Sequence, residues 1–202
     1  AQSVAFAKDF APYGMHRDAL VVSALTELGI AAKQVGSAYA VEPGSVRKAD
    51  GTPYAVFTPF SKIWMQIGWP APFATPRVSW SGAPAIATEP IPSDPPCAAQ
   101  LPEASEEAAW NTWEEFRATG LDTYNDNRNN PDIAGTSTLS PYLRFGLIHP
   151  RSLLAELNET KAHAVYRSEL GWREFYADVL FHQPRTMREN LQRKMDAIKL
   201  DI

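Results

Sequence analysis

The run Gly-Thr-Ser-Thr-Leu-Ser-Pro-Tyr-Leu-Arg-Phe-Gly at residues 135–146, with Ser-Glu-Leu-Gly-Trp-Arg-Glu-Phe-Tyr at residues 168–176, governs how the rest of the chain is interpreted. Gly135 permits a tight turn, and four hydroxyl side chains follow it. Ser140 and Pro141 form a favourable N-cap and N1 pair, which predicts a helix through Arg144. Hydroxyls and free amides at such a turn suit a phosphate or diphosphate, although the same residues also suit a turn that only caps a helix.

The second run belongs to a predicted helix from Val165 to Phe181 that is apolar around most of its circumference, as expected for a buried helix. Buried charges need partners, and two interpretations satisfy this need. In one, Glu169 pairs with Arg173 and Trp172 packs in the core. In the other, the helix contributes to a site for an aromatic, anionic ligand such as a nucleotide. Both start from four side chains spaced to share one helix face, Glu169, Trp172, Arg173 and Tyr176.

Other helices are expected around this stretch. Acidic residues open a run from Glu103 to Phe116, where an apolar face is followed by Gly120 as a stop signal. His149 and Pro150 open a further helix. After residue 102 the sequence has no strand pattern, which predicts an all-α domain. The side chains expected to face inward from these two helices are Ala109, Trp113, Phe116, Leu153, Leu154 and Leu157.

The first third of the chain predicts a different class of structure. A short apolar strand at Ser3–Ala7, a helix at Met15–Leu28 and a second strand near Ala38–Val41 form a βαβ pattern, which implies a parallel sheet. A sheet of two parallel strands cannot cover both of its faces, so we expect the chain to begin inside an α/β domain. A helix from Ser61 to Ile67 follows, with Ile63, Trp64 and Ile67 on one side.

Proline marks the expected boundary between these two parts. Nine of the 17 prolines fall between Pro70 and Pro102, and proline removes a backbone donor, so this length reads as an extended linker. The expected divisions are the end of an α/β domain at 1–69, a linker at 70–102 and the beginning of an all-α domain at 103–202.

Composition excludes several classes of protein. A net charge of -4 argues against a generally basic nucleic-acid-binding protein, although residues 142–195 carry nine Lys/Arg against six Asp/Glu, a local balance of 9 - 6 = +3. The single cysteine, Cys97, cannot form an internal disulfide, and no Cys/His cluster has zinc-ligand spacing. We expect no metal site, no membrane span and a cytoplasmic location.

The two opening runs, in this order and separation, resemble the first half of the FAD-binding domain of the DNA photolyase and cryptochrome family. Upstream, three segments are similar to the end of that family's Rossmann-like N-terminal domain and its exit: Arg17-Asp18, residues 41–44, and residues 56–60 followed by Trp64. The resemblance implies an incomplete α/β antenna domain, a linker that matches only in its proline-rich character, and an incomplete all-α FAD-binding domain.

The resemblance also implies functions for particular residues. Glu169 and Trp172 match the pair that meets a flipped pyrimidine dimer, by hydrogen bonds to the base edges and by stacking, and Arg128 matches a contact to the DNA backbone. In the family, reduced FAD excited by blue light donates an electron to the cyclobutane dimer, which splits and returns it. No catalytic residue is expected in this segment. The positions that match FAD contacts are Tyr124, Thr136, Ser137, Thr138, Leu139, Ser140, Tyr166 and Arg173.

Departures from the family pattern qualify these expectations. Thr138 stands where relatives often carry a basic residue, and Tyr13-Gly14 lack the acidic residue of folate-binding relatives, which favours a deazaflavin antenna or none. The chain ends before the family's remaining flavin contacts, which the full-length chain would supply. The leading hypothesis is a cyclobutane pyrimidine dimer photolyase acting on damaged DNA. The alternatives are a cryptochrome-type blue-light signalling flavoprotein and an inactive truncated photolyase.

Overall fold

A computed structural model of the chain describes residues 2–74, 76–79 and 89–198. Strands β1 (Ser3–Lys8) and β2 (Ala31–Ser37) flank helix α1 (Pro12–Glu27). The strands pair in parallel, with Ser3 opposite Ala31. The βαβ expectation is therefore confirmed, but the second strand was placed too late. Residues 38–41 form a bend instead, because the buried carboxylate of Glu174 accepts hydrogen bonds from the amides of Ala40 and Val41.

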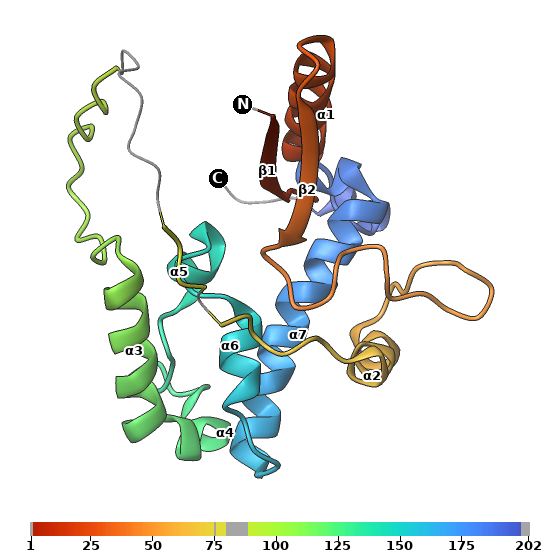
Figure 1. Ribbon diagram of the computed structural model, residues 1–202. Coiled ribbons are helices and arrows are strands. Elements are labelled where there is room, and N and C mark those ends of the chain that lie inside the picture. The colour runs from red at the N-terminus through yellow and green to blue at the C-terminus, as the bar shows by residue number, and fades with distance from the viewer. Residues whose placement is uncertain (1, 75, 80–88, 199–202) are drawn as a thin grey trace.

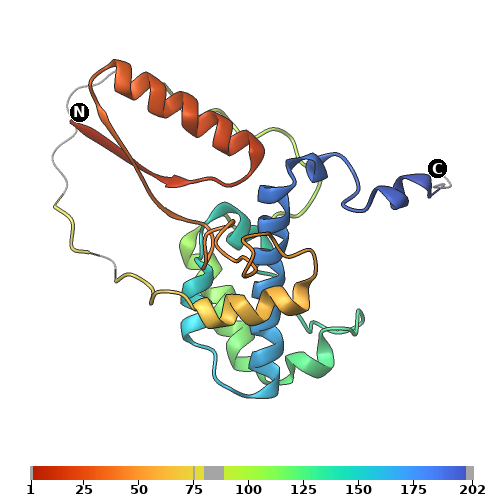
Figure 2. The same cartoon turned by 90° about the vertical axis from the view of Figure 1, so that its right-hand side faces the viewer.

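The βαβ unit carries little core of its own. Every described residue of β1 and β2 stays at least partly exposed. In α1 only Gly14 and Asp18 are buried. Asp18 accepts hydrogen bonds from the backbone amide of Asp9 at 3.2 Å and from the guanidinium of Arg17. Figures 1 and 2 both show this unit beyond one end of the helical part.

The helical part is arranged around α7 (Lys161–His182), the long helix at the centre of Figure 2. Helix α2 (Phe57–Ile67) begins earlier than expected, and Phe60 rather than Ile67 joins Trp64 in the core, since Ile67 is half exposed. Phe60 packs edge-on against Phe175, with 5.2 Å between the ring centroids. The other helices are α3 (Glu106–Thr119), α4 (Tyr124–Asn127), α5 (Ser140–Phe145) and α6 (Pro150–Ala155). Short 3-10 turns lie at Leu121–Thr123, Pro184–Met187 and Arg193–Ala197.

Local capping chemistry explains where α3 and α6 begin. Helix α3 begins at Glu106, three residues later than the expected run, because Ser105 caps it by accepting a hydrogen bond from the amide of Ala108. Gly120 ends the helix, and its inward face buries Ala109, Trp113 and Phe116 as expected. His149 caps α6, where Leu153 and Leu154 are buried.

The proline-rich stretch is described at residues 70–74, 76–79 and 89–102, and none of these residues lies in a helix or strand. The described residues after β2 contain no further strand. No helix among the described residues is long and apolar enough to cross a membrane.

Candidate functional site

A pocket of about 1060 Å³ lies where the βαβ unit meets α5 and α7. Such a volume suits a cofactor-sized ligand. Its walls come from the end of β1, the bend after β2, the turn at residues 135–140 and one face of α7. The pocket brings together nine of the residues singled out from the sequence: Tyr124, Thr136, Ser137, Thr138, Leu139, Ser140, Tyr166, Glu169 and Arg173. Arg128 and Trp172 do not line it.

Residues 135–140 are called here the hydroxyl turn, and all of them except Gly135 line this pocket. Gly135 is buried so tightly that an added Cβ would lie 2.6 Å from the carbonyl oxygen of Asn127, so it is close packing that requires glycine. Thr138 has a φ of 53°, which is uncommon for a β-branched residue. Its hydroxyl donates to the carbonyl of Ser137 at 2.7 Å. The hydroxyls of Thr136 and Ser140 form no hydrogen bond with any other described residue.

The start of α5 differs from expectation. Leu139 is its N-cap, Ser140 is the first helical residue, and no side chain caps the helix. The Ser140 hydroxyl is therefore not needed for capping. Because Ser140 is exposed and lines the pocket, that hydroxyl is available to a ligand.

Tyr166 connects the hydroxyl turn to the core. Its hydroxyl donates to Ser137 Oγ at 3.0 Å. Its ring stacks on Trp113 and meets the ring of Tyr124 edge-on, with centroid distances of 5.6 Å and 5.1 Å. Burial raises the pKa of Tyr166 to about 12, so the phenol keeps its proton and remains a donor.

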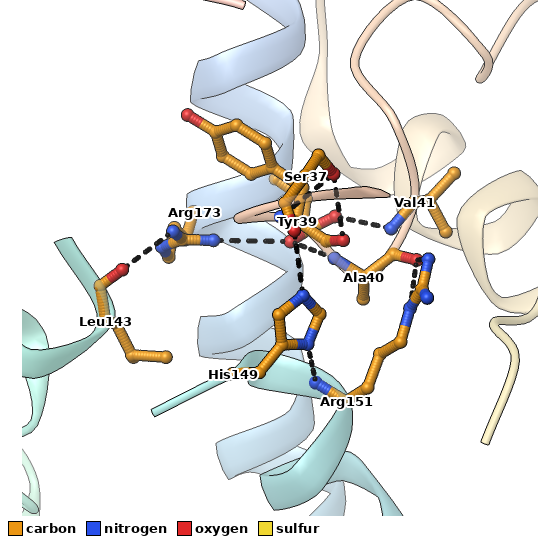
Figure 3. Close-up of polar contacts among 9 residues, drawn as sticks. Ser37, Tyr39, Ala40, Val41, Leu143, His149, Arg151 and Arg173 are labelled. Atoms are coloured by element: carbon orange, nitrogen blue, oxygen red, sulfur yellow. Dashed lines mark hydrogen bonds and ion pairs between the residues drawn. The ribbon is translucent and has the colours of Figure 1, made fainter. Parts of the chain in front are cut away.

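Arg173 contributes a mostly buried cation to the pocket (Figure 3). Its Nη2 donates to the carbonyl of Leu143 at 3.1 Å, and its Nη1 lies 3.4 Å from Glu174 Oε1. The guanidinium also lies over the ring of Tyr39, 4.6 Å from the ring centroid. Burial lowers the pKa of Arg173. The acid that pairs with Arg173 is Glu174, so the interpretation that Glu169 pairs with Arg173 is wrong.

Glu169 pairs instead with Arg128, which follows α4. A hydrogen bond from Arg128 Nη1 to Glu169 Oε1 joins them and raises the pKa of Arg128. The guanidinium of Arg128 also lies over the ring of Tyr124 at 5.5 Å. The pair is partly exposed, at 27% for Arg128 and 32% for Glu169, and only Glu169 of the two lines the pocket.

Trp172 lies on a different side of α7 from the pocket. Its indole stacks on Phe57 of α2 at 3.8 Å with an interplanar angle of 12°. Tyr176 stacks on it at 5.5 Å. The stack is partly exposed, since Phe57 and Trp172 are half-buried and Tyr176 is 60% exposed.

The sequence analysis missed several important residues, most of which belong to or bind the bend at residues 37–44, called here the connector. Glu174 accepts from the amides of Ala40 and Val41, each at 3.0 Å. Asp178 accepts from the amide of Gly44 at 2.7 Å. Glu174 and Asp178 lie four residues apart in a largely buried helix, and buried carboxylates need hydrogen-bond donors, so the sequence did signal that such donors exist. Tyr39 and Arg144, which also line the pocket, had no such signal.

The helical part holds the connector from a second side as well. Arg151 donates to the carbonyl of Ala40 from Nε at 3.0 Å and from Nη2 at 2.8 Å. His149 Nε2 lies 2.9 Å from the carbonyl of Ser37, while its Nδ1 accepts from the amide of Arg151. Both ring nitrogens are thus used by the neutral form. Among the described residues, no group of three or more His, Cys, Asp or Glu side chains could hold a metal ion.

Comparison with known proteins places this geometry in a family. A family model described as DNA photolyase matches residues 1–77. A protein of Synechococcus sp. named deoxyribodipyrimidine photo-lyase is 36% identical over 208 residues, which cover 91% of this chain and 43% of the relative. The chain thus spans less than half the length of that relative.

Solved structures show the same fold. A bacterial class III photolyase from Agrobacterium tumefaciens matches 98% of this chain and 45% of its own, with a TM-score of 0.73 and 24% identity. A cryptochrome from Synechocystis sp. PCC6803 matches 90% of this chain and 42% of its own, with a TM-score of 0.68 and 21% identity. By sequence and by fold, this chain belongs to the DNA photolyase family.

Proposed function

We propose that this chain serves light-dependent repair of cyclobutane pyrimidine dimers in DNA, as the part of a photolyase that forms one wall of the FAD pocket. The observation that carries the proposal is the pocket itself. It gathers hydroxyls of the hydroxyl turn that have no partner among the described residues and a mostly buried cation from α7, which lies more than thirty residues later in the chain.

The donor set fits a flavin dinucleotide. A diphosphate needs hydrogen-bond donors and positive charge, which Thr136, Ser140 and the exposed Arg144 provide along one wall. Arg173 provides a second, desolvated cation, and Tyr166 fixes the Ser137 hydroxyl. When bound, FAD supplies the light-driven electron transfer to the dimer. The chain's own residues bind and orient the cofactor and limit the access of water.

Three further residues are proposed to meet the lesion. Glu169 keeps Oε2 free of any hydrogen bond with the described residues, so it can accept from a base edge while Oε1 stays with Arg128. Arg128 is partly exposed and can contact a phosphate. Trp172 is proposed to stack on the extruded pyrimidines, and because Phe57 and Tyr176 both stack on its indole here, this contact requires one of those rings to move aside.

The absence of an acidic residue at Tyr13-Gly14 supports a deazaflavin antenna, or none, over a folate. We also propose a cytoplasmic location, where the exposed Cys97 would stay reduced.

The first test is the visible absorption spectrum of the purified protein, with the bound material released by heat and identified. Near-stoichiometric FAD and removal of thymine dimers from an oligonucleotide only under blue light support the proposal. Equal repair in the dark would overturn it, and bound flavin without repair would favour the cryptochrome alternative. A colourless protein would mean that these 202 residues alone carry out no photochemistry.

Two variants distinguish the proposed lesion contacts from the proposed cofactor contacts. Glu169→Ala should lower repair more than flavin content, because the proposed partner of Glu169 is the lesion. Arg173→Gln should lower flavin content first. The reverse pattern would move Glu169 into the cofactor contacts.

A further inference from the structure

Arg173 is held by few direct contacts for a side chain of its kind. A guanidinium has five N–H donors, and the described partners are the carbonyl of Leu143 and, at 3.4 Å, one oxygen of Glu174. That carboxylate is already engaged, because its two oxygens accept from the amides of Ala40 and Val41. The hydrogen bonds alone therefore leave the plane of the guanidinium weakly determined.

The ring of Tyr39 supplies the missing constraint. The guanidinium lies 4.6 Å from the ring centroid, within cation–π range (Figure 3). Two factors disfavour the charged form of Arg173. Burial lowers its pKa most, and the positive charge of Arg144 lowers it further. The Tyr39 ring therefore gives a favourable contact to a guanidinium whose charged form is disfavoured by its surroundings.

The connector fixes Tyr39 itself. On one side of it, the carbonyl of Ser37 meets His149. On the other, Ala40 is held at its amide by Glu174 and at its carbonyl by Arg151. The amide of Tyr39 donates to Ser37 Oγ at 3.2 Å, and its ring packs edge-on against Phe10 at 6.2 Å. A residue anchored on both sides presents its ring at a defined place in the pocket wall.

We propose that Tyr39 is a positioning residue, whose ring face holds the guanidinium of Arg173 toward the ligand. This role rests on the proposed function for its ligand, FAD, but not for the contact itself. The ring face carries the role, since the hydroxyl of Tyr39 forms no hydrogen bond with the other described residues. Tyr39 thus brings the connector into the lining of a pocket built mainly by helices.

The test compares Tyr39→Leu with Tyr39→Phe in the complete chain. In the flavin-free protein, the Arg173 δ-CH2 and Nε–H resonances should be shifted upfield by the aromatic ring. The leucine variant should lose that shift, and the phenylalanine variant should keep it. With FAD added, the leucine variant should bind about tenfold more weakly and the phenylalanine variant as wild type. Thermal midpoints of all variants show whether each has folded.

A double variant separates positioning from general damage. In the Arg173→Gln background, Tyr39→Leu should cause no further loss of FAD affinity. An equal loss in both backgrounds would overturn the proposal, as would Arg173 resonances that do not respond to Tyr39→Leu. If no form of the protein binds FAD, these 202 residues alone do not hold the cofactor, while the flavin-free resonances still decide whether Tyr39 positions Arg173.

Discussion

The connector and the hydroxyl turn both pack against α7, yet they treat their polar groups in opposite ways. In the connector, buried carboxylates bind the amides of Ala40, Val41 and Gly44. In the hydroxyl turn, the side chains of Thr136 and Ser140 face the pocket without a partner among the described residues. Satisfied polar groups hold a fold together, and open donors in a cavity are available to a ligand. Helix α7 thus stabilises the connector through Glu174 and Asp178 near its C-terminal end, and it lines the pocket with residues mostly nearer its N-terminal end.

The largest expected effect comes from removing the carboxylate that binds the connector. Glu174→Ala leaves the amides of Ala40 and Val41 buried without an acceptor, which should lower the free energy of unfolding by about 3 kcal/mol. Glu169→Ala is the matched control on the same helix. It removes a partly exposed pair and should cost less than about 1 kcal/mol. Chemical denaturation measures both, and equal losses would contradict the contrast between the two regions.

The next effect tests the packing behind the hydroxyl turn. In Gly135→Ala the new methyl group would lie 2.6 Å from a backbone oxygen of Asn127, which cannot rotate away. The turn must shift, at a cost of about 2 kcal/mol. We expect FAD affinity to fall by at least about tenfold, measured by fluorescence titration. Gly44→Ala is the counterpart in the connector, where φ is +88° and the new methyl would meet the ring of Phe181, and it should reduce stability. Unchanged FAD affinity in Gly135→Ala would show that the turn does not hold the cofactor.

A smaller effect is the pH dependence of the connector. Burial raises the pKa of Glu174 to about 6 from the ordinary 4.5, so the folded state binds this proton more tightly than the unfolded chain. The contribution of Glu174 to the free energy of unfolding should therefore increase by about 1 kcal/mol as pH falls from about 7 to about 5. Burial lowers the pKa of His149 from 6.5, and the stability linked to its neutral form is lost as pH falls from 6.5 toward the lowered pKa.

The two groups oppose each other, and Glu174→Gln separates them. The variant should lose stability on acidification relative to the wild type, as measured by denaturation at a series of pH values. Parallel pH profiles for the two proteins would show that Glu174 does not titrate in this range.

The smallest effect concerns backbone strain in the hydroxyl turn. Thr138 adopts φ 53°, which asparagine tolerates better than a β-branched residue. Thr138→Asn should raise the free energy of unfolding by about 0.5 kcal/mol. Thr136→Asn, at a neighbouring position without a positive φ, should bring no gain. A gain of equal size at both positions would show that strain is not the cause.

The sequence predicted those parts of the fold that depend on local patterns. The apolar face of α3, its end at Gly120 and the start of α6 at Pro150 follow from helical periodicity and capping. The sequence failed where a distant partner decides. The second strand was placed at residues 38–41 because they are apolar, but Glu174, more than 130 residues later, binds the amides that a strand would have used.

The candidate site divides along the same line. By itself, the sequence determined the family, the hydroxyl turn and the spacing of Glu169, Trp172 and Arg173 along one helix. Only the tertiary structure decided that Glu169 pairs with Arg128, that Trp172 packs on Phe57 and that Tyr39 lies under Arg173. The reason is physical. A helix repeats every 3.6 residues wherever it lies, whereas a contact between distant segments depends on how the intervening chain folds.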